Sequence, residues 1–415
     1  MEHLNQYFLE ALNAALRSQT VDWAGPLSDG EWRGLFQLAR IHSVLPLIYE
    51  AVYPCPAAQR LDPALLRPYK EQAIQTAVLQ AVRTRDFLRL ERGLEAAGVT
   101  PLVVKGLICR ELYPRPDLRP SGDEDILIPP GQFSACHGAM AAQGLEPLEP
   151  EGDPEAAHEV PYGKRDGALR IELHKALFPP DSEAYGDWNR FFDGVFDRAV
   201  TETVQGASVP TLGYTDHLFY LICHAFKHFL HSGFGIRQVC DIVLFANAHG
   251  DSVDWAAILS RCRELHAELF TAALFQIGWK YLNFDPERAC YPAEWGAIRV
   301  DEAPLLEDLL SGGIYGAADL SRRHSSGITL NAVAADKKGG KKGRPLLKTL
   351  FPPAKSLERR YPYLKGRPYL LPAAWIDRIV HYGKELKSDS NSRASEAIQI
   401  GNRRLRLLRQ YGVIR

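Results

Sequence analysis

Two aspartates separated by one residue, Asp123 and Asp125, are the side chains of this sequence whose spacing first suggests chemistry. They open the run DEDILI, which predicts a β-strand over residues 123–128 that ends at Pro129. Successive side chains of a strand point to opposite faces, so the two carboxylates share one face. Carboxylates this close repel each other unless a cation lies between them. Their oxygens suit Mg²⁺ or Mn²⁺, which often join protein carboxylates to substrate phosphates.

A third acid, Glu172, lies in the run ALRIELH, which alternates as a strand over residues 168–174. An acid between two apolar neighbours in such a strand is unfavourable to bury unless it has a partner. His174, two residues further on, shares the face of Glu172. Since Asp-x-Asp alone is common at solvated strand ends, this third acid is one of two observations that favour a metal site.

The second observation is a glycine turn upstream of the aspartates. The apolar run PLVVK at residues 101–105 predicts a strand that ends at Gly106, followed by a short helix over residues 106–113 closed by Pro114. Glycine allows backbone N–H groups to approach a phosphate closely. The segment is therefore a candidate phosphate-binding loop.

These strands must be positioned by a compact unit in which helices pack on a sheet. A further helix is predicted over residues 132–143, ended by Gly144, and helical patterns dominate on both sides of the unit. We therefore predict an α+β fold, with a small mixed-sheet core flanked by N-terminal and C-terminal helical regions. The expected organisation is an N-terminal helical region (1–85), the α/β core (86–205), a helical domain closing the cleft (206–310), and a basic loop with a C-terminal helical tail (311–415).

Helical periodicity supports the flanking regions. Three apolar stripes are expected to face the core: Leu4, Phe8, Leu12 and Ala15; Trp32, Leu35, Phe36 and Ala39; and Ile74, Val78, Val82, Phe87, Leu90 and Leu94, on a long helix that ends at Gly98. A loop is predicted near residues 310–345, ending in the basic run KKGGKKGR at 337–344, and an amphipathic helix from about Ala373 to Leu386.

Four histidines, His217, His224, His228 and His231, lie near one face of a predicted helix over residues 217–231. Zinc binding is one interpretation, but no acid completes a spacing such as HExxH. The alternatives are a face that lines a nucleotide or substrate cleft, and ordinary packing.

On the next predicted helix, Arg237 and Asp241 lie one turn apart. The spacing predicts either a structural ion pair or groups that orient a base or a phosphate. Lys227 is a weaker candidate for contact with a phosphate.

Composition narrows the functional class. The 415 residues carry a formal net charge of -1 and are 46% apolar, which predicts several packed domains and gives no general argument for nucleic-acid binding. The seven cysteines are scattered without a CxxC pair, as in reduced cytosolic proteins. No signal peptide and no run of about 18 apolar residues is evident, so we expect a cytoplasmic protein without a membrane span.

A glycine after the first strand, Asp-x-Asp on the next and a third acid on a later strand resemble the nucleotidyltransferase superfamily typified by DNA polymerase β. The closer resemblance is to a bacterial family of uncharacterised nucleotidyltransferases. It rests on the block VVKGLICRELYPRPDLRPSGDEDILI, and on LHKAL, LICHAFKHF, IRQVCDIVLF and RRYPYL…LLPAAWIDRI, and covers most of the chain.

The resemblance implies a role for each matching residue. Asp123 and Asp125 would hold both metals, and Glu172 would complete the second metal site near the acceptor hydroxyl. The resemblance also implies that Lys105, Gly106, Arg119 and Ser121 bind the nucleotide. The two predicted helices described above add further candidates for nucleotide binding: His224, Lys227, His228, Arg237 and Asp241.

The implied reaction is transfer of a nucleoside monophosphate from an NTP to an acceptor hydroxyl, with Mg²⁺ or Mn²⁺ as cofactor and pyrophosphate released. The acceptor, a small molecule, a protein or an RNA, is not identified. Two departures keep alternatives open: Leu107 replaces the usual serine, and Glu124, in place of an apolar residue, adds a charge on the buried side of the strand or bends it. The alternatives are a phosphotransferase that uses the same metal site and a non-catalytic nucleotide-binding scaffold or sensor.

Overall fold

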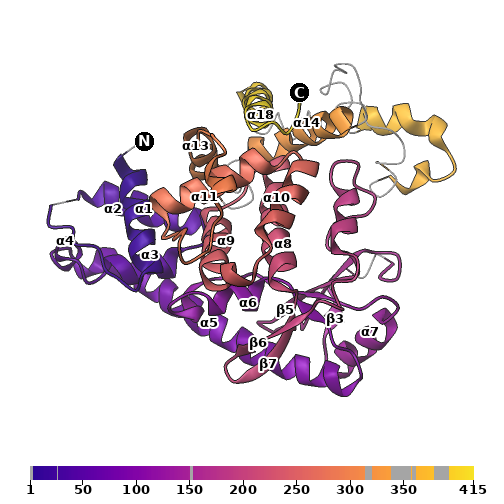
Figure 1. The fold of residues 1–415 in the computed structure, drawn as a ribbon, viewed down its shortest axis with the longest axis horizontal. Helices are drawn as coiled ribbons and strands as arrows, with labels where there is room; N and C mark the ends of the chain where they lie inside the picture. The colour runs from indigo at the N-terminus through magenta and orange to yellow at the C-terminus, as the bar shows by residue number, and fades with distance from the viewer. Residues whose placement is uncertain are drawn as a thin grey trace.

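The computed structural model describes residues 3–25, 27–149, 153–313, 320–337, 357, 361–377 and 392–415. A seven-stranded mixed sheet lies at its centre, in the order β3-β4-β5-β2-β1-β7-β6. The strands are β1 (Leu102–Val103), β2 (Glu124–Leu127), β3 (Glu146–Pro147), β4 (Glu159–Gly163), β5 (Arg170–His174), β6 (Val200–Val204) and β7 (Ala207–Thr211). Helices flank the sheet on the N-terminal and C-terminal sides (Figure 1), so the predicted α+β class is confirmed.

The three predicted strands are present as β1, β2 and β5, with β2 parallel to β5 and antiparallel to β1. The other four strands were not predicted. β4 and β7 each contain a proline, which disfavours a strand. Polar residues interrupt β6 and β7, so no apolar run marks these two strands in the sequence. The hairpin between β6 and β7 turns at Gln205 and Gly206, which both have positive φ, as a two-residue type I′ turn requires.

The N-terminal region is helical, as expected. It comprises α1 (His3–Leu16), α2 (Asp29–Ile41), α3 (Leu45–Val52), α4 (Pro56–Gln59) and the long helix α5 (Pro63–Ala96), which continues across residue 85. The stripes of α1 and α2 face the core. A capping box between Ser28 and Glu31 begins α2, since each residue's side chain accepts a hydrogen bond from the other's backbone N–H.

The predicted apolar stripe of α5 is wrong in its first half. Ile74 and Val78 are 53% and 58% exposed, whereas Phe87 and the residues after it on the stripe are buried. In the middle of the helix the buried side chains are instead the polar Gln80 and Thr84. Both side chains face a buried polar network next to β2. Contact with this network, and not the apolar periodicity, therefore decides which face of α5 is buried.

The remaining helices are α6 (Gly106–Glu111), α7 (Phe133–Ala142), α8 (Tyr214–Leu230), α9 (Ile236–His249), α10 (Trp255–Glu264), α11 (Glu268–Tyr281), α12 (Ala293–Gly296), α13 (Ala303–Gly312), α14 (Leu320–Lys337) and α18 (Ser392–Gln410). The predicted helices over 106–113 and 132–143 are confirmed as α6 and α7. No described helix is both long enough and apolar enough to span a bilayer.

The prediction of a loop near residues 310–345 is wrong over most of the described part of this range, because residues 320–337 form α14. Ile328, Val333 and Ala334 of α14 are buried, and the helix packs on α18 (Figure 1). This tertiary partner stabilises a segment whose polar composition hides its periodicity. The basic run after Lys337 lies outside the described residues, as does the predicted helix beyond residue 377; residues 373–377 are helical.

The two faces of the sheet have different neighbours. On one face Ile126, Ile171 and Leu173 pack with Phe87 and Leu90 of α5 in an apolar cluster. On the other side of the sheet stand α8 and α9, whereas α5 runs along the side of the apolar cluster (Figure 1). Because side chains alternate along β2 and β5, Asp125 and Glu172 lie on the face toward α8.

Candidate functional site

Asp125 and Glu172 are register partners on the parallel strands β2 and β5. Asp125 is fully buried, and the side chain of Glu172 is 30% exposed. Asp123 comes one residue before β2, is half-buried, and lines an adjoining pocket. The strand pairing therefore brings two of the three predicted carboxylates together and leaves the third at the pocket edge.

His174 joins this pair. Its Nε2 lies 3.1 Å from Oδ1 of Asp125 and 3.8 Å from Oε2 of Glu172. On the other side of the ring, Nδ1 lies 3.6 Å from Oε2 of Glu159. Among the described residues, Asp125, Glu172 and His174 are a group that could hold a metal ion, with candidate ligand atoms all within 4.8 Å of one another. We refer to these three residues as the carboxylate–histidine cluster.

Lys105, from the predicted phosphate loop, reaches the same aspartate. Its Nζ lies 2.9 Å from Oδ1 of Asp125 and donates to Nε2 of His224 at 3.2 Å. Lys105 precedes α6, whereas His224 belongs to α8, so the lysine links the loop, the sheet and the helix above it. In this state its ammonium group neutralises Asp125.

The electrostatics of the cluster reflect a shortage of positive charge. Burial opposes ionisation of Asp125, but Lys105 and His174 hold its pKa well below the usual range. Burial, together with the charges of Asp125 and Asp123, raises the pKa of Glu172 to about 9. The site thus neutralises one carboxylate with its own lysine and keeps the next protonated near neutral pH.

Glu124 points to the opposite face of β2 and is fully buried there, beside Arg110 of α6. Arg110 also donates to Ser121 and Thr84, and Ser121 lies 3.1 Å from Glu124. The departure at Glu124 therefore places a charge on the buried side of a regular strand, as one of our alternatives expected, and an internal arginine compensates it. We call Arg110, Glu124, Ser121, Thr84 and Gln80 the support network.

This network explains the glycine of the loop. Gly106 has φ of +24°, and a Cβ atom there would lie 2.1 Å from Oε2 of Glu124. The neighbouring Leu107, which replaces the usual serine, is fully buried in the apolar cluster below the sheet. The loop can offer backbone groups to a ligand, but it has no hydroxyl at this position.

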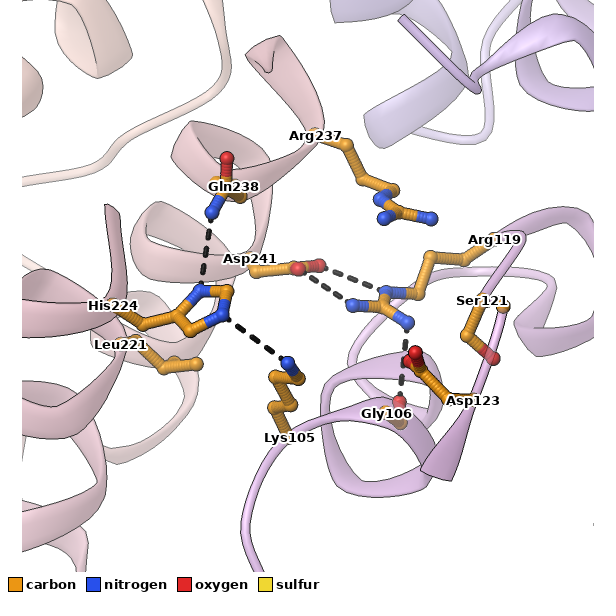
Figure 2. A pocket seen from close by; sticks show the side chains of 11 residues that line it. Lys105, Gly106, Arg119, Ser121, Asp123, Leu221, His224, Arg237, Gln238 and Asp241 are labelled. Atoms are coloured by element: carbon orange, nitrogen blue, oxygen red, sulfur yellow. Dashed lines mark hydrogen bonds and ion pairs between the residues drawn. The ribbon is translucent and has the colours of Figure 1, made fainter. Parts of the chain in front are cut away.

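The pocket beside the cluster lies between the loop, the segment before β2, and helices α8 and α9 (Figure 2). It is lined by Lys105, Gly106, Arg119, Ser121, Gly122, Asp123, Leu221, His224, Arg237, Gln238 and Asp241. Most of the residues predicted to bind the nucleotide therefore line one pocket next to the carboxylates. Whether they bind a nucleotide stays a prediction.

Asp241 forms its ion pair with Arg119, not with Arg237. The guanidinium of Arg119 donates to both carboxylate oxygens, at 3.0 Å and 2.6 Å, and both side chains are buried (Figure 2). Arg237 donates to the carbonyl of Pro120, and its buried Nε has no hydrogen-bond partner among the described residues. The alternative of an Arg237–Asp241 ion pair is therefore not what forms.

The four histidines predicted on one helical face, three of them on α8 and His231 directly after it, do not act as one set. Nδ1 of His224 lies 3.1 Å from Nε2 of Gln238, and its Nε2 lies 3.3 Å from Nε2 of His228. His217 contacts Thr211 at 3.1 Å, and His231 contacts Tyr185 at 2.8 Å. Of the four, only His224 lines the pocket. The other three contact neighbouring side chains outside the pocket lining.

Lys227 lies on the same helix, one turn from His224 and close enough to interact electrostatically with Glu159, Asp125 and Glu172. Burial, together with Lys105, lowers its pKa. The lysine is half-buried and does not line the pocket. It therefore lies on the side of the carboxylate–histidine cluster and not on the side of the pocket.

Sequence reasoning missed Glu159, Arg110 and the role of His174. The alternation of β5 had placed His174 on the face of Glu172, which was the available signal. Glu159 stands opposite His174 on β4, a strand that its proline concealed. Arg110 had no signal in its own segment, because its partner Glu124 is 14 residues away.

A family model described as "Uncharacterised nucleotidyltransferase" matches residues 28–281. This range includes the loop, all seven strands, and helices α8 and α9. Neither a curated protein nor a solved structure matches the chain.

Proposed function

Because the chain belongs to the uncharacterised nucleotidyltransferase family, we propose that it transfers a nucleoside monophosphate from an NTP to an acceptor hydroxyl and releases pyrophosphate. The single observation that supports this most is the juxtaposition of Asp125 and Glu172 in register, with the Lys105–Gly106 loop beside them. In such transfer the protein mainly positions the reactants and neutralises charge.

The donor set fits a divalent cation. Asp123, Asp125 and Glu172 offer hard oxygen ligands, and the buried Oδ2 of Asp125 has no hydrogen-bond partner among the described residues. We propose that these three carboxylates hold Mg²⁺ or Mn²⁺. When bound, the ions would activate the acceptor oxygen and stabilise the triphosphate.

The pocket supplies the remaining roles. We propose that Lys105 and Arg237 bind the triphosphate, because both are cationic and line the pocket next to Asp123. Arg119 contacts the carbonyl of Gly106 at 3.3 Å while it is held by Asp241, so it positions the loop against α9. We propose that Glu172 faces the acceptor, because its side chain is 30% exposed whereas Asp125 and His174 are buried.

The test is thermal stabilisation by each NTP, with and without Mg²⁺ or Mn²⁺. A ligand that binds only the folded state at 100 times its Kd stabilises by about 2.7 kcal/mol. We expect a metal-dependent rise in Tm that Asp123→Asn/Asp125→Asn abolishes. No rise with any NTP would contradict the proposal.

Mass analysis of candidate acceptors after incubation with the NTP identifies the transferred group. An added nucleoside monophosphate supports our proposal, and an added phosphate would instead make the protein a phosphotransferase. Metal-dependent NTP binding with no modified acceptor and no pyrophosphate would favour a nucleotide-binding scaffold.

A further inference from the structure

We propose that His174 is a metal ligand, and that Asp125, Glu172 and His174 form a mixed carboxylate–imidazole site that prefers Mn²⁺ to Mg²⁺. The inference deepens the proposed function and rests on it only for the reaction that the metal serves. Metal binding itself can be tested without a nucleotide or an acceptor.

The geometry of the imidazole carries the argument. His174 is almost fully buried, and its Nε2 points at the two carboxylates, 3.1 Å from Asp125 and 3.8 Å from Glu172. His174 lies beside Glu172 because the two residues share one face of β5, and beside Asp125 because β5 pairs with β2, so the strand pairing brings all three donors to one place. One donor atom from each residue converges within 4.8 Å, as a single ion requires.

Asp125 provides an independent observation. The residue is fully buried, and Lys105 and His174 both contact its Oδ1. Its Oδ2 is buried without a hydrogen-bond partner in the described part of the chain. Leaving a buried acceptor unsatisfied destabilises the folded state, and more strongly if the acceptor is charged. A cation bound to this oxygen would remove that penalty.

Glu159 is the carboxylate near the other ring nitrogen of His174. It stands opposite His174 in the β4–β5 register, and its Oε2 lies 3.6 Å from Nδ1, too far for a hydrogen bond, so Nδ1 is buried without a hydrogen-bond partner among the described residues. A ligating histidine commonly has a carboxylate on its other nitrogen, which sets the tautomer and the orientation of the ring. In the metal-free state Nε2 donates to Asp125, so metal binding would require the imidazole proton to sit on Nδ1 instead, on the side of Glu159.

The ligand types set the metal preference. Mg²⁺ prefers an octahedral shell of oxygens, whereas imidazole nitrogen favours first-row transition metals. Two carboxylates against one imidazole leave the set mainly hard, which suits Mn²⁺ among those metals. The single nitrogen therefore shifts the preference from Mg²⁺ to Mn²⁺ without excluding phosphate ligands.

The experiment measures Mn²⁺ binding to the full, nucleotide-free chain by the loss of the free-ion EPR signal, and Mg²⁺ binding by competition. We expect Mn²⁺ to bind more tightly than Mg²⁺. His174→Asn should weaken Mn²⁺ binding by at least about tenfold and remove the preference, and Glu159→Gln should weaken it by about tenfold. The matched control is His249→Asn, since His249 also lies beside a carboxylate, 3.9 Å from Glu202, but outside the cluster.

Pulsed EPR of the wild-type protein provides a second measurement that needs no variant. Coupling of bound Mn²⁺ to an imidazole nitrogen, changed by ¹⁵N-histidine labelling, is the expected result. Absence of Mn²⁺ binding, absence of nitrogen coupling, or a folded His174→Asn with unchanged preference would each overturn the proposal. Metal-dependent NTP stabilisation without nitrogen coupling would reject this ligand while leaving the proposed function intact.

Discussion

Glu124 and Asp125 are neighbours in β2 and both fully buried, yet their side chains point to opposite faces of the strand and have different charged partners. Glu124 meets Arg110, which is itself fully buried, so one negative charge is matched by one permanent positive charge. Asp125 meets Lys105, whose side chain is 16% exposed, and shares its face with Glu172 and Glu159. If all three carboxylates were ionised, they would outnumber the two lysines near them, Lys105 and Lys227. A carboxylate whose partner is fully buried supports the fold, and one that lies among other carboxylates and has a partly exposed partner is available to a ligand.

The largest expected difference concerns turnover. Asp125→Asn should slow the reaction by about a thousandfold, or about 4 kcal/mol, because it removes charge from the face that would hold the cation. The measurement is pyrophosphate release with the acceptor found by mass analysis. Glu124→Asp is the comparison, since it keeps the charge on the opposite face. Equal losses in both folded variants would mean that the two faces do not have separate roles.

The next effect concerns stability. Arg110→Met should destabilise the protein by about 3–5 kcal/mol, because it leaves Glu124 buried without its partner. Urea denaturation followed by circular dichroism measures the loss. The double variant Arg110→Met/Glu124→Leu should recover most of it, since an apolar pair can replace a buried ion pair. A double variant no more stable than the single one would show that the pair does more than balance charge.

Gly106→Ala tests the contact between the support network and the loop. The added Cβ would lie 2.1 Å from Oε2 of Glu124, so we expect a loss of about 1–3 kcal/mol. Gly122→Ala is the matched control, because a Cβ at Gly122 meets no atom within 4 Å. Denaturation midpoints of the two variants give the comparison. Equal midpoints would mean that Glu124 moves aside without cost.

The smallest expected effect tests Lys105, the partly exposed partner on the other face. Lys105→Met should tighten Mn²⁺ binding to the nucleotide-free protein by about fivefold, or about 1 kcal/mol, because the ammonium group no longer competes for Asp125. The same variant should weaken NTP binding, since it removes a cation from the pocket. Isothermal titration calorimetry measures both. Weaker Mn²⁺ binding in a folded variant would show that Lys105 assists the ion.

Much of the core could be predicted because its signals are local. The strand before Gly106 and the strands that carry Asp125 and Glu172 can be recognised from apolar runs and alternation within five to seven residues. Strand periodicity also placed His174 on the correct face. Predictions failed where a distant partner decides: Val78 is exposed and Gln80 buried on α5 because the support network faces that helix, and α14 is a helix because α18 covers it.

By itself, the sequence determined the α+β class, the order of the site-bearing strands, and which face of each strand carries a carboxylate, because these follow from side-chain period and turn residues. Only the tertiary structure decided the partners: Arg110 for Glu124, Arg119 for Asp241, Lys105 and His174 for Asp125, and Glu159 for His174. Charge pairing depends on distance in space. Strand register and helix packing bring together residues that are far apart in the chain.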